Sequence, residues 1–370
     1  MKRMLVRRRL IRWLACVAVA AAANVVMPSG LVHANDSAGR SVDRSSRSIA
    51  PPSECAIARL TEPKGSGMSI VSGADPSGRF VVGRGYPTDP YGDYRRYPVI
   101  WDRGVPTLVD LPGVDQLLED VNSTGTAVGT SYDTDTWMAL TPWLYRNRRL
   151  TALPGVTSGA ARAINERGDI VGVRYTETTV PVWWPADGGP SRPVALPLPP
   201  GASSGEAFDV DEDGTIVGFY TDEAGVDRGY VWLPDGSGKT LPLPAGTGPS
   251  SSTFSIRNGW AVGFIGSADG LLPVRWHVRT NNVQVFPKFE TRPNAVNRHG
   301  WMAGTGKTDT ELTGRALFLH DTGGLILPGL ANHFEPLGDI ATELSDDGRT
   351  LAGQALDTTG ALRAVQWRCR

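Results

Sequence analysis

The sequence contains few of the residues from which metal sites and nucleophilic active sites are built. Its 370 residues include 3 cysteines and 5 histidines. Four histidines follow residue 34, and none stands at metal-ligand spacing: His277, His299, His320 and His333. No nucleophile elbow, phosphate-binding loop or cysteine–histidine signature occurs either. We therefore expect no metal, no cofactor and no catalytic residue of these kinds.

Long apolar runs are missing after the first 30 residues. The run at 13–27 has 15 residues, whereas a membrane-spanning helix needs about 20. It follows a basic start without acidic residues and precedes the small residue Ala34, so 1–34 is predicted to be a signal peptide, with a retained membrane anchor as the alternative. The twin-arginine and general secretory (Sec) routes both stay open. Residues 35–53 are rich in Ser, Arg and Pro and predict a flexible linker, so we expect a secreted, periplasmic or extracellular bacterial protein.

An excess of positive charge is also absent. The whole chain carries 37 basic and 38 acidic residues, and loss of the leader would leave 31 against 38. No basic stripe of the kind that binds nucleic acid is present, so nucleic acid is not expected as a partner. Mild acidity mainly favours solubility.

What the sequence does contain is a turn motif that recurs seven times. Its clearest copy is AINERGDIVG at 163–172, and the closing glycines of successive copies are 46, 43, 46, 45, 41 and 49 residues apart. The copies occupy 72–83, 120–129, 163–172, 209–218, 255–263, 295–304 and 343–353. Asn or Asp opens a tight turn and Gly supplies the positive φ that returns the chain, so each copy predicts a β-hairpin.

Two further predicted strands follow each hairpin. The third often carries Trp, as in PVWW (181–184), and the fourth ends in Leu-Pro, as in LTALP (150–154). Four strands per 45 residues or so, without helical periodicity, are typical of a propeller blade. We predict an all-β fold over residues 54–370, a seven-bladed β-propeller of four-stranded blades; an open stack of small sheets is the alternative. The recurring tryptophans are expected to pack between sheets: Trp101, Trp184, Trp232, Trp276 and Trp367.

The two ends of the repeat region complement each other. The last repeat stops after its third strand, AVQWRCR (364–370), while the segment 57–63 precedes the first hairpin and has no blade of its own. We therefore predict that the N-terminal strand completes the last blade and closes the ring. Cys55 and Cys369 flank this seam, so a disulfide between them is predicted, with two free thiols as the alternative. A closed ring of this kind is expected to be a monomer, with no membrane contact beyond export.

The hairpin motif resembles the extracellular HAF repeat of bacterial secreted proteins. Those units read Ala-Ile-Asn-x-x-Gly-x-Ile-Val-Gly followed by His-Ala-Phe-x-Trp. The likeness covers 55–370; the hairpin half is well kept, whereas in the second half GRALFLHD (314–321) and RGYVWLPDG (228–236) come closest and lack the histidine. The resemblance implies a secreted, propeller-like fold and supplies no catalytic residues to carry over.

The loops between second and third strands would all emerge on one face. In blades one to four they carry aromatic residues: Tyr86, Tyr91, Tyr94, Tyr132, Trp137, Tyr175 and Tyr220. Carboxylates lie among them, including Asp93, Asp133, Asp135 and Glu177. Amphipathic rings beside carboxylates suit binding of a glycan or an extracellular protein.

Three functions are consistent with this loop face. The first is a non-catalytic binding propeller that recognises glycan or protein. The second is a carbohydrate-active hydrolase or lyase that uses the four carboxylates as acids, and the third is an envelope-associated scaffold. Asp209, Asp211 and Asp213 match the start of a calcium loop, but Tyr220 stands where a bidentate Glu is required, so calcium binding stays open and turn chemistry is favoured.

Overall fold

The computed structural model describes residues 50–87, 96–133, 139–188, 192–268, 270–286, 289–308, 311–321, 323–331 and 338–370. The chain divides into two units, Met1–Ser48 and Ile49–Arg370, and the described residues belong to the second. The predicted signal peptide and most of the predicted linker therefore lie outside the described residues.

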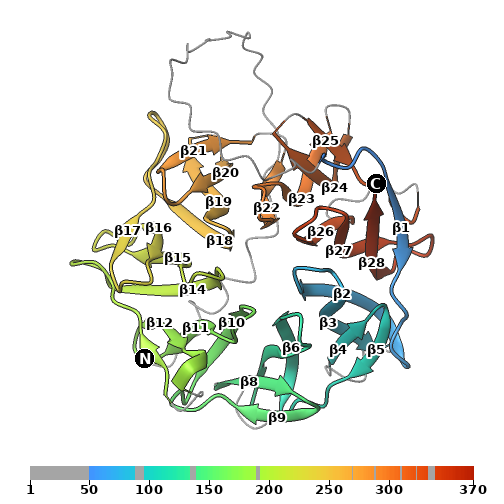
Figure 1. Cartoon of the computed structure of the whole chain (residues 1–370), viewed down its shortest axis with the longest axis horizontal. Coiled ribbons are helices and arrows are strands. Elements are labelled where there is room, and N and C mark those ends of the chain that lie inside the picture. The colour runs from blue at the N-terminus through green and yellow to red at the C-terminus, as the bar shows by residue number, and fades with distance from the viewer. Residues whose placement is uncertain are drawn as a thin grey trace, which may run out of the picture. The chain divides into compact units, whose positions relative to one another are not determined.

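The second unit is a seven-bladed β-propeller, and each blade is a four-stranded antiparallel sheet (Figure 1). Blade 1 contains β2 (Ser66–Ala74), β3 (Phe80–Pro87), β4 (Tyr97–Asp102) and β5 (Val105–Leu108). Blade 2 contains β6 (Val114–Val121), β7 (Ala127–Tyr132), β8 (Leu140–Arg146) and β9 (Arg149–Ala152). Blade 3 contains β10 (Gly159–Ile164), β11 (Ile170–Tyr175), β12 (Thr179–Trp184) and β13 (Val194–Ala195), with a 3-10 turn η1 (Ala186–Gly188) before β13.

The remaining blades repeat this order. Blade 4 contains β14 (Ser204–Val210), β15 (Ile216–Thr221), β16 (Asp227–Trp232) and β17 (Gly238–Thr240). Blade 5 contains β18 (Ser251–Arg257), β19 (Trp260–Ser267), β20 (Gly270–His277) and β21 (Asn282–Val285). Blade 6 contains β22 (Phe289–Val296), β23 (Met302–Thr308), β24 (Glu311–His320) and β25 (Gly323–Ile326). Blade 7 contains β26 (Ile340–Leu344), β27 (Thr350–Leu356), β28 (Leu362–Cys369) and, from the other end of the unit, β1 (Cys55–Arg59). The predicted fold class is confirmed.

The first strand of each blade lies innermost. First strands of successive blades contact one another all round the ring, from β2 through β6, β10, β14, β18, β22 and β26 back to β2 (Figure 1). The tight turns after the first strands therefore lie on one face, here called the turn face. The loops between second and third strands lie on the opposite face, here called the loop face.

Each innermost strand contains a β-bulge at the same place. The register with the second strand shifts by one residue just before the tight turn in all seven blades. A bulge leaves one extra residue unpaired and turns its side chain in a new direction. The seven extra residues, here called the axial residues, are Ser72, Glu119, Arg162, Phe208, Phe254, Asn294 and Thr342.

The bulge explains the glycine that closes each hairpin motif. In blade 3 a Cβ on Gly172 would collide with the carbonyl oxygen of Ala160 on the neighbouring innermost strand. The equivalent glycine meets the equivalent carbonyl in six of the seven blades. The recurring glycine is therefore required by close backbone approach, a use of glycine distinct from the positive φ of Gly168 in the turn itself.

The turn Asn or Asp does more than shape its own turn, because its side chain also joins neighbouring blades. Asn165 accepts hydrogen bonds from the backbone N–H groups of Arg167 and Asp169 in its own turn. Its Nδ2 donates to the carbonyl oxygen of Asp211 in blade 4 (3.1 Å), and Asn122 in blade 2 donates to the carbonyl oxygen of Asn165 (3.1 Å). One motif residue thus stabilises both the hairpin and the contact between blades.

The Trp and Leu-Pro signals belong to one interaction. Trp184 is buried (1% exposed) and its Nε1 donates to the carbonyl oxygen of Pro154, which follows the outer strand of the preceding blade (3.1 Å). Trp232, Trp276 and Trp367 bond the Pro carbonyls of their preceding blades in the same way. The Leu-Pro pairs lie in the connections after the fourth strands, not at the strand ends, since β9 ends at Ala152.

The ring is closed as predicted. β1 pairs antiparallel with β28, so that Cys55 lies opposite Cys369, and the two form a disulfide across 314 residues. In Figure 1 the blue β1 runs beside the dark red β28. Trp101 of blade 1 bonds the carbonyl oxygen of Thr61 (2.8 Å), so Leu60-Thr61 takes the place that Leu-Pro holds in other blades.

Candidate functional site

The axial residues form the surface that faces the centre of the ring. All seven are partly exposed, whereas the residue before each of them is buried: Val71, Leu118, Ala161, Ala207, Thr253, Pro293 and Ala341. The bulge therefore turns one side chain per blade away from the packed sheets and toward the axis. Because these side chains differ in chemistry from blade to blade, the axial surface is asymmetric.

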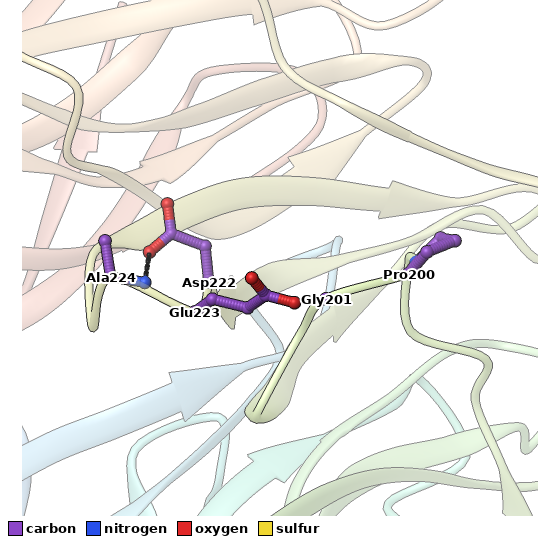
Figure 2. Close-up of a pocket in the computed structure, with 5 residues that line it drawn as sticks. All are labelled: Pro200, Gly201, Asp222, Glu223 and Ala224. Atoms are coloured by element: carbon purple, nitrogen blue, oxygen red, sulfur yellow. Dashed lines mark hydrogen bonds between the residues drawn. The ribbon is translucent and has the colours of Figure 1, made fainter.

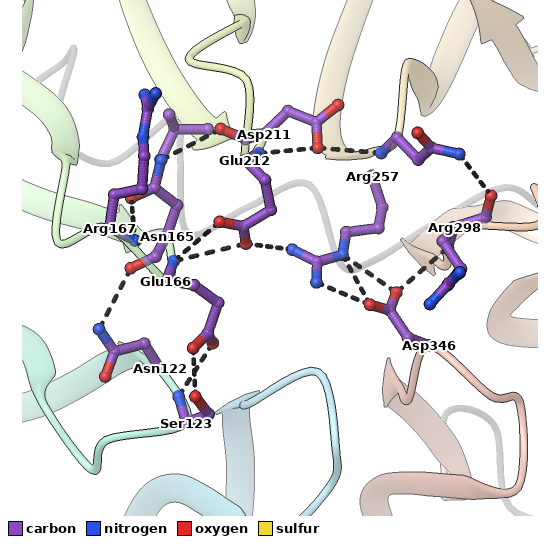
Figure 3. Close-up of polar contacts among 12 residues, drawn as sticks. Asn122, Ser123, Asn165, Glu166, Arg167, Asp211, Glu212, Arg257, Arg298 and Asp346 are labelled. Carbon is purple, nitrogen blue, oxygen red and sulfur yellow. Dashed lines mark hydrogen bonds and ion pairs between the residues drawn. The ribbon is translucent and has the colours of Figure 1, made fainter.

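The turn-face end of the axis is held by paired charges (Figure 3). Arg257 of blade 5 donates to Glu212 of blade 4, and its Nη2 lies 2.7 Å from Asp346 of blade 7. Glu212 also accepts the backbone N–H of Glu166 (3.1 Å), whose carboxylate accepts the backbone N–H of Ser123 (2.9 Å). This chain of contacts joins blades 2, 3, 4, 5 and 7. Each of these side chains already has partners within the ring, which favours a structural role.

Three carboxylates lie one residue beyond the bulge. Asp120 and Asp209 each accept the backbone N–H of the next blade (2.8 Å), from Ile164 and Ile256 respectively. Burial, reinforced by the charge of Asp209, raises the pKa of Asp120 to about 8. Burial also raises the pKa of Asp209 to about 6 and holds that of Glu343 well above its usual value. Asp120 and Asp209 stabilise contacts between blades, and all three groups carry protons at higher pH than free carboxylates.

The loop-face half of the axis holds a cluster around Arg162 of blade 3. Its guanidinium contacts Glu119 of blade 2 (3.2 Å) and Glu206 of blade 4 (3.6 Å), and Nη2 donates to the hydroxyl of Tyr175 (3.5 Å). Burial raises the pKa of Tyr175 to about 12 and raises that of Tyr132, a rise that the charge of the nearby Arg162 opposes in part. These five residues are here called the Arg162 cluster. Burial alone would lower the pKa of Arg162, but the two carboxylates outweigh it and keep the guanidinium charged.

The structure brings together two of the seven aromatic residues predicted for binding. Tyr132 and Tyr175 belong to the Arg162 cluster. Tyr86 lies elsewhere, with the guanidinium of Arg96 over its ring at 4.4 Å. Tyr220 packs edge-on against Tyr230 with ring centroids 5.3 Å apart, away from the cluster.

The other predicted site residues fall into two groups. Tyr91, Asp93, Tyr94, Asp135 and Trp137 lie outside the described residues. Glu177 is exposed in the turn between β11 and β12, and Asp133 is partly buried beyond the end of β7.

Sequence reasoning missed Glu119, Arg162 and Glu206. All three lie on innermost strands shortly before the hairpin motifs that begin at 120, 163 and 209, whereas the prediction considered only the turns themselves. A signal was present, since position 162 carries Arg inside the otherwise small and apolar run AARAI. Aligned repeats show a different residue type at this bulge position in most blades, as expected where packing does not dictate the choice.

The loop face also carries a shallow hollow in blade 4 (Figure 2). It has a volume of about 480 Å³ and is lined by Pro200, Gly201, Asp222, Glu223 and Ala224. Asp222 is already used, because it accepts the backbone N–H of Ala224 (3.0 Å) and pairs with Arg228 (2.8 Å). The hollow is open and lacks enclosed polar groups, so the Arg162 cluster is the stronger candidate site.

The aspartates of the calcium-like motif turn to separate partners. Asp209 and Asp211 accept backbone N–H groups of blade 5, and Asp213 pairs with Arg279 (2.9 Å). Within the described part of the chain, no group of three His, Cys, Asp or Glu side chains is arranged to hold a metal ion. Over the same residues, no helix has the length and apolar character needed to cross a membrane.

Comparisons with known proteins support the fold and no more. No family model and no curated protein matches the sequence. The β-propeller domain of the Trilobed protease from Pyrococcus furiosus, described as having an open velcro topology, is similar with a TM-score of 0.56 and 9% identity, over 81% of this chain and 95% of that one. An inactive virginiamycin B lyase from Staphylococcus aureus, solved with quinupristin, gives a TM-score of 0.53 and 12% identity, over 86% of this chain and 100% of that one.

Puromycin hydrolase is a third similar structure, from a mutant complexed with PGG. It gives a TM-score of 0.55 and 15% identity over 81% of this chain. The match covers 53% of the hydrolase, so this chain spans about half its length. These neighbours include hydrolases and a lyase, but at such low identity they define a β-propeller without assigning an activity.

Proposed function

We propose that the protein is an exported, non-catalytic binding propeller that holds an extracellular glycan at the loop-face end of its axis. The observation that supports this is the cluster around Arg162, whose guanidinium contacts the Tyr175 hydroxyl and two carboxylates and whose charge acts on the pKa of Tyr132. Tyrosine offers an apolar ring and a polar hydroxyl together, and a fixed guanidinium and carboxylates supply directional hydrogen bonds to sugar hydroxyls. Binding sites typically combine such rigid surfaces with a few converging polar groups.

Export is proposed on separate grounds. The basic and then apolar start of the sequence has the form of a signal peptide. The disulfide between Cys55 and Cys369 is a bond that persists in oxidising compartments. The resemblance to secreted HAF repeats points the same way.

The experiment is a glycan array probed with the purified mature chain, followed by titration of the best glycan. The double variant Tyr132→Phe, Tyr175→Phe removes only two hydroxyls and is expected to weaken binding at least tenfold. Tyr220→Phe is the matched control, because that hydroxyl contacts Thr240 on the outer strand of blade 4. An array without any bound glycan would overturn the proposal, and so would equal losses in the double variant and the control.

A further inference from the structure

The axial surface of blades 3 to 6 carries a continuous arc of four side chains. Phe208 and Phe254 are neighbouring axial residues with ring centroids 5.0 Å apart. The guanidinium of Arg162 lies 5.9 Å from the ring centroid of Phe208 at one end, and that of Arg292 lies 3.7 Å from the ring centroid of Phe254 at the other. All four side chains are partly exposed, so a ligand at the axis can touch them.

The two phenylalanines are fixed from behind. Phe219 stacks on Phe208 at 5.8 Å, and Phe264 stacks on Phe254 at 5.7 Å, each from the second strand of the same blade. Rings supported in this way offer a preformed apolar surface, and binding to them costs little ordering entropy.

The two arginines of the arc differ in one respect. Arg162 is paired with Glu119 and Glu206. Among the residues that the structure describes, Arg292 has no carboxylate partner and donates no hydrogen bond, and its only specific contact is the face of Phe254. Burial lowers the pKa of Arg292 to about 10, yet it stays charged at neutral pH. A partly buried cation without a counter-charge is costly to the folded protein, and an anion that pairs with it regains that free energy.

We propose that Arg292, Phe254 and Phe208 form a binding site for an organic anion, in which a carboxylate pairs with the Arg292 guanidinium and an aromatic or other apolar group lies on the two rings. Guanidinium binds carboxylate with two parallel hydrogen bonds. The adjacent rings then select a carboxylate that carries an apolar group over acetate or inorganic phosphate. The site lies on blades 4 to 6 and does not rest on the glycan proposal, which concerns blades 2 to 4.

The test is a titration of the mature protein with phenylacetate at low salt, followed by ligand-observed NMR. Phenylacetate is expected to bind, and phenylacetamide, acetate and phosphate are expected to bind at least tenfold more weakly. Arg292→Met should weaken phenylacetate binding at least tenfold, and Phe254→Leu should weaken phenylacetate without changing acetate. Arg349→Met, which removes an exposed arginine of the turn face, is the matched control and should bind as the parent does.

A second measurement separates a binding role from a structural one. Without ligand, Arg292→Met should unfold at the same or a higher temperature than the parent, because it removes a charge that has no carboxylate partner among the described residues. Phenylacetate should raise the unfolding temperature of the parent only. Lower stability of Arg292→Met would overturn the proposal, and so would equal binding of phenylacetamide or unchanged binding by the variant. If the parent protein binds a glycan but does not bind phenylacetate, this anion site is ruled out while the glycan proposal stands.

Discussion

At the scale of single residues, the position directly after the bulge has different roles in different blades. Asp120 in blade 2 uses its carboxylate to accept a backbone N–H of blade 3, whereas Ala163 at the equivalent place in blade 3 makes no such bond. The carboxylate of Asp120 is shielded from solvent and lies near the charge of Asp209. Asp120 therefore makes a contact between blades, and its pKa of about 8 means that it keeps its proton at neutral pH.

Asp120 makes stability depend on pH in a definite direction. Its folded-state pKa lies above the unfolded value of about 4, so its contribution is complete below pH 4 and is lost as pH rises toward 8. One such proton lowers the free energy of unfolding by at most about 1.4 kcal/mol per pH unit in that range. The expected result is a loss of stability between pH 7 and 8, measured by urea unfolding, that Asp120→Asn reduces.

The window from pH 7 to 8 avoids an opposing effect. Burial lowers the pKa of His277, His299 and His320, so these groups add stability as pH rises through the range near 6. They are unchanged in Asp120→Asn, so the difference between variant and parent reports Asp120 together with its effect on Glu343, whose pKa the Asp120 charge helps to raise. Asp110→Asn, at an exposed aspartate, is the control, and its free energy of unfolding should depend on pH as that of the parent does. If the free energy of unfolding of Asp120→Asn falls between pH 7 and 8 as steeply as that of the parent, Asp120 is not the group responsible.

At the scale of the strand and the blade, the decisive feature is the bulge on each innermost strand. It brings the carbonyl of that strand against the second strand, which leaves room only for glycine, and it exposes one side chain to the axis. The bulge therefore accounts both for the glycine that closes each hairpin motif and for the side chain that each blade presents to the axis. Blade 6 departs from the rule, because Pro293 pairs with Gly304 and the carbonyl of Arg292 lies farther away.

The closing glycines should consequently differ in their tolerance of alanine. Gly172→Ala is expected to lose about 3 kcal/mol or more of stability, since the new methyl group collides with a backbone carbonyl that cannot move alone. Gly304→Ala should lose only about 1 kcal/mol, because the nearest atoms to its Cβ lie at 3.0 and 3.1 Å, on Phe289 and at the Arg292 carbonyl. Urea unfolding followed by tryptophan fluorescence measures both. Losses of equal size would show that the bulge does not set the glycine requirement.

The strands, the order of the blades and the partner of each cysteine could be predicted from the sequence because they depend on local, repeated chemistry. Turn residues, strand periodicity and the 45-residue interval are all visible along the chain. The Arg162 cluster could not be predicted in the same way, since Glu119, Arg162 and Glu206 come from three repeats. They meet only because the bulge turns them toward a common axis, and no pattern within one repeat reports that direction.

The predicted tyrosines differ because of their place along the second strand. Tyr132 is the last residue of β7, three after its closing glycine, whereas Tyr220 is the penultimate residue of β15, two after its closing glycine. Successive side chains of a strand point to opposite faces, so this offset of one residue gives the two tyrosines different surroundings. Tyr220 finds Tyr230 and Thr240 on the outer strands of its own blade, while Tyr132 is coupled to the charges around Arg162. Composition therefore identified a face of the molecule but not the residues on it that converge.

At the scale of the whole molecule, closure depends on one seam, where strands from the two ends of the described unit meet. The pairing extends beyond β1 and β28, because Ser53 and Glu54 bond the backbone of Arg370 and Leu60 bonds that of Ala364. Cys55 and Cys369 stand where blade 1 has the turn residues Arg103 and Gly104. The disulfide therefore supplies the covalent connection that a hairpin turn supplies in the other blades.

Removal of the disulfide should lower the stability of the ring while the fold is retained. The double variant Cys55→Ser, Cys369→Ser is expected to lose about 2–4 kcal/mol of stability in urea unfolding, the typical contribution of a disulfide that closes a long loop. Its far-UV circular dichroism should remain that of the parent, because the backbone hydrogen bonds of the seam persist. A thiol reductant should lower the free energy of unfolding of the parent to that of the variant and should leave the variant's value unchanged. Equal stability of parent and variant would mean that strand pairing alone closes the ring, and loss of the β-sheet signal would mean that the bond is needed for the ring to form.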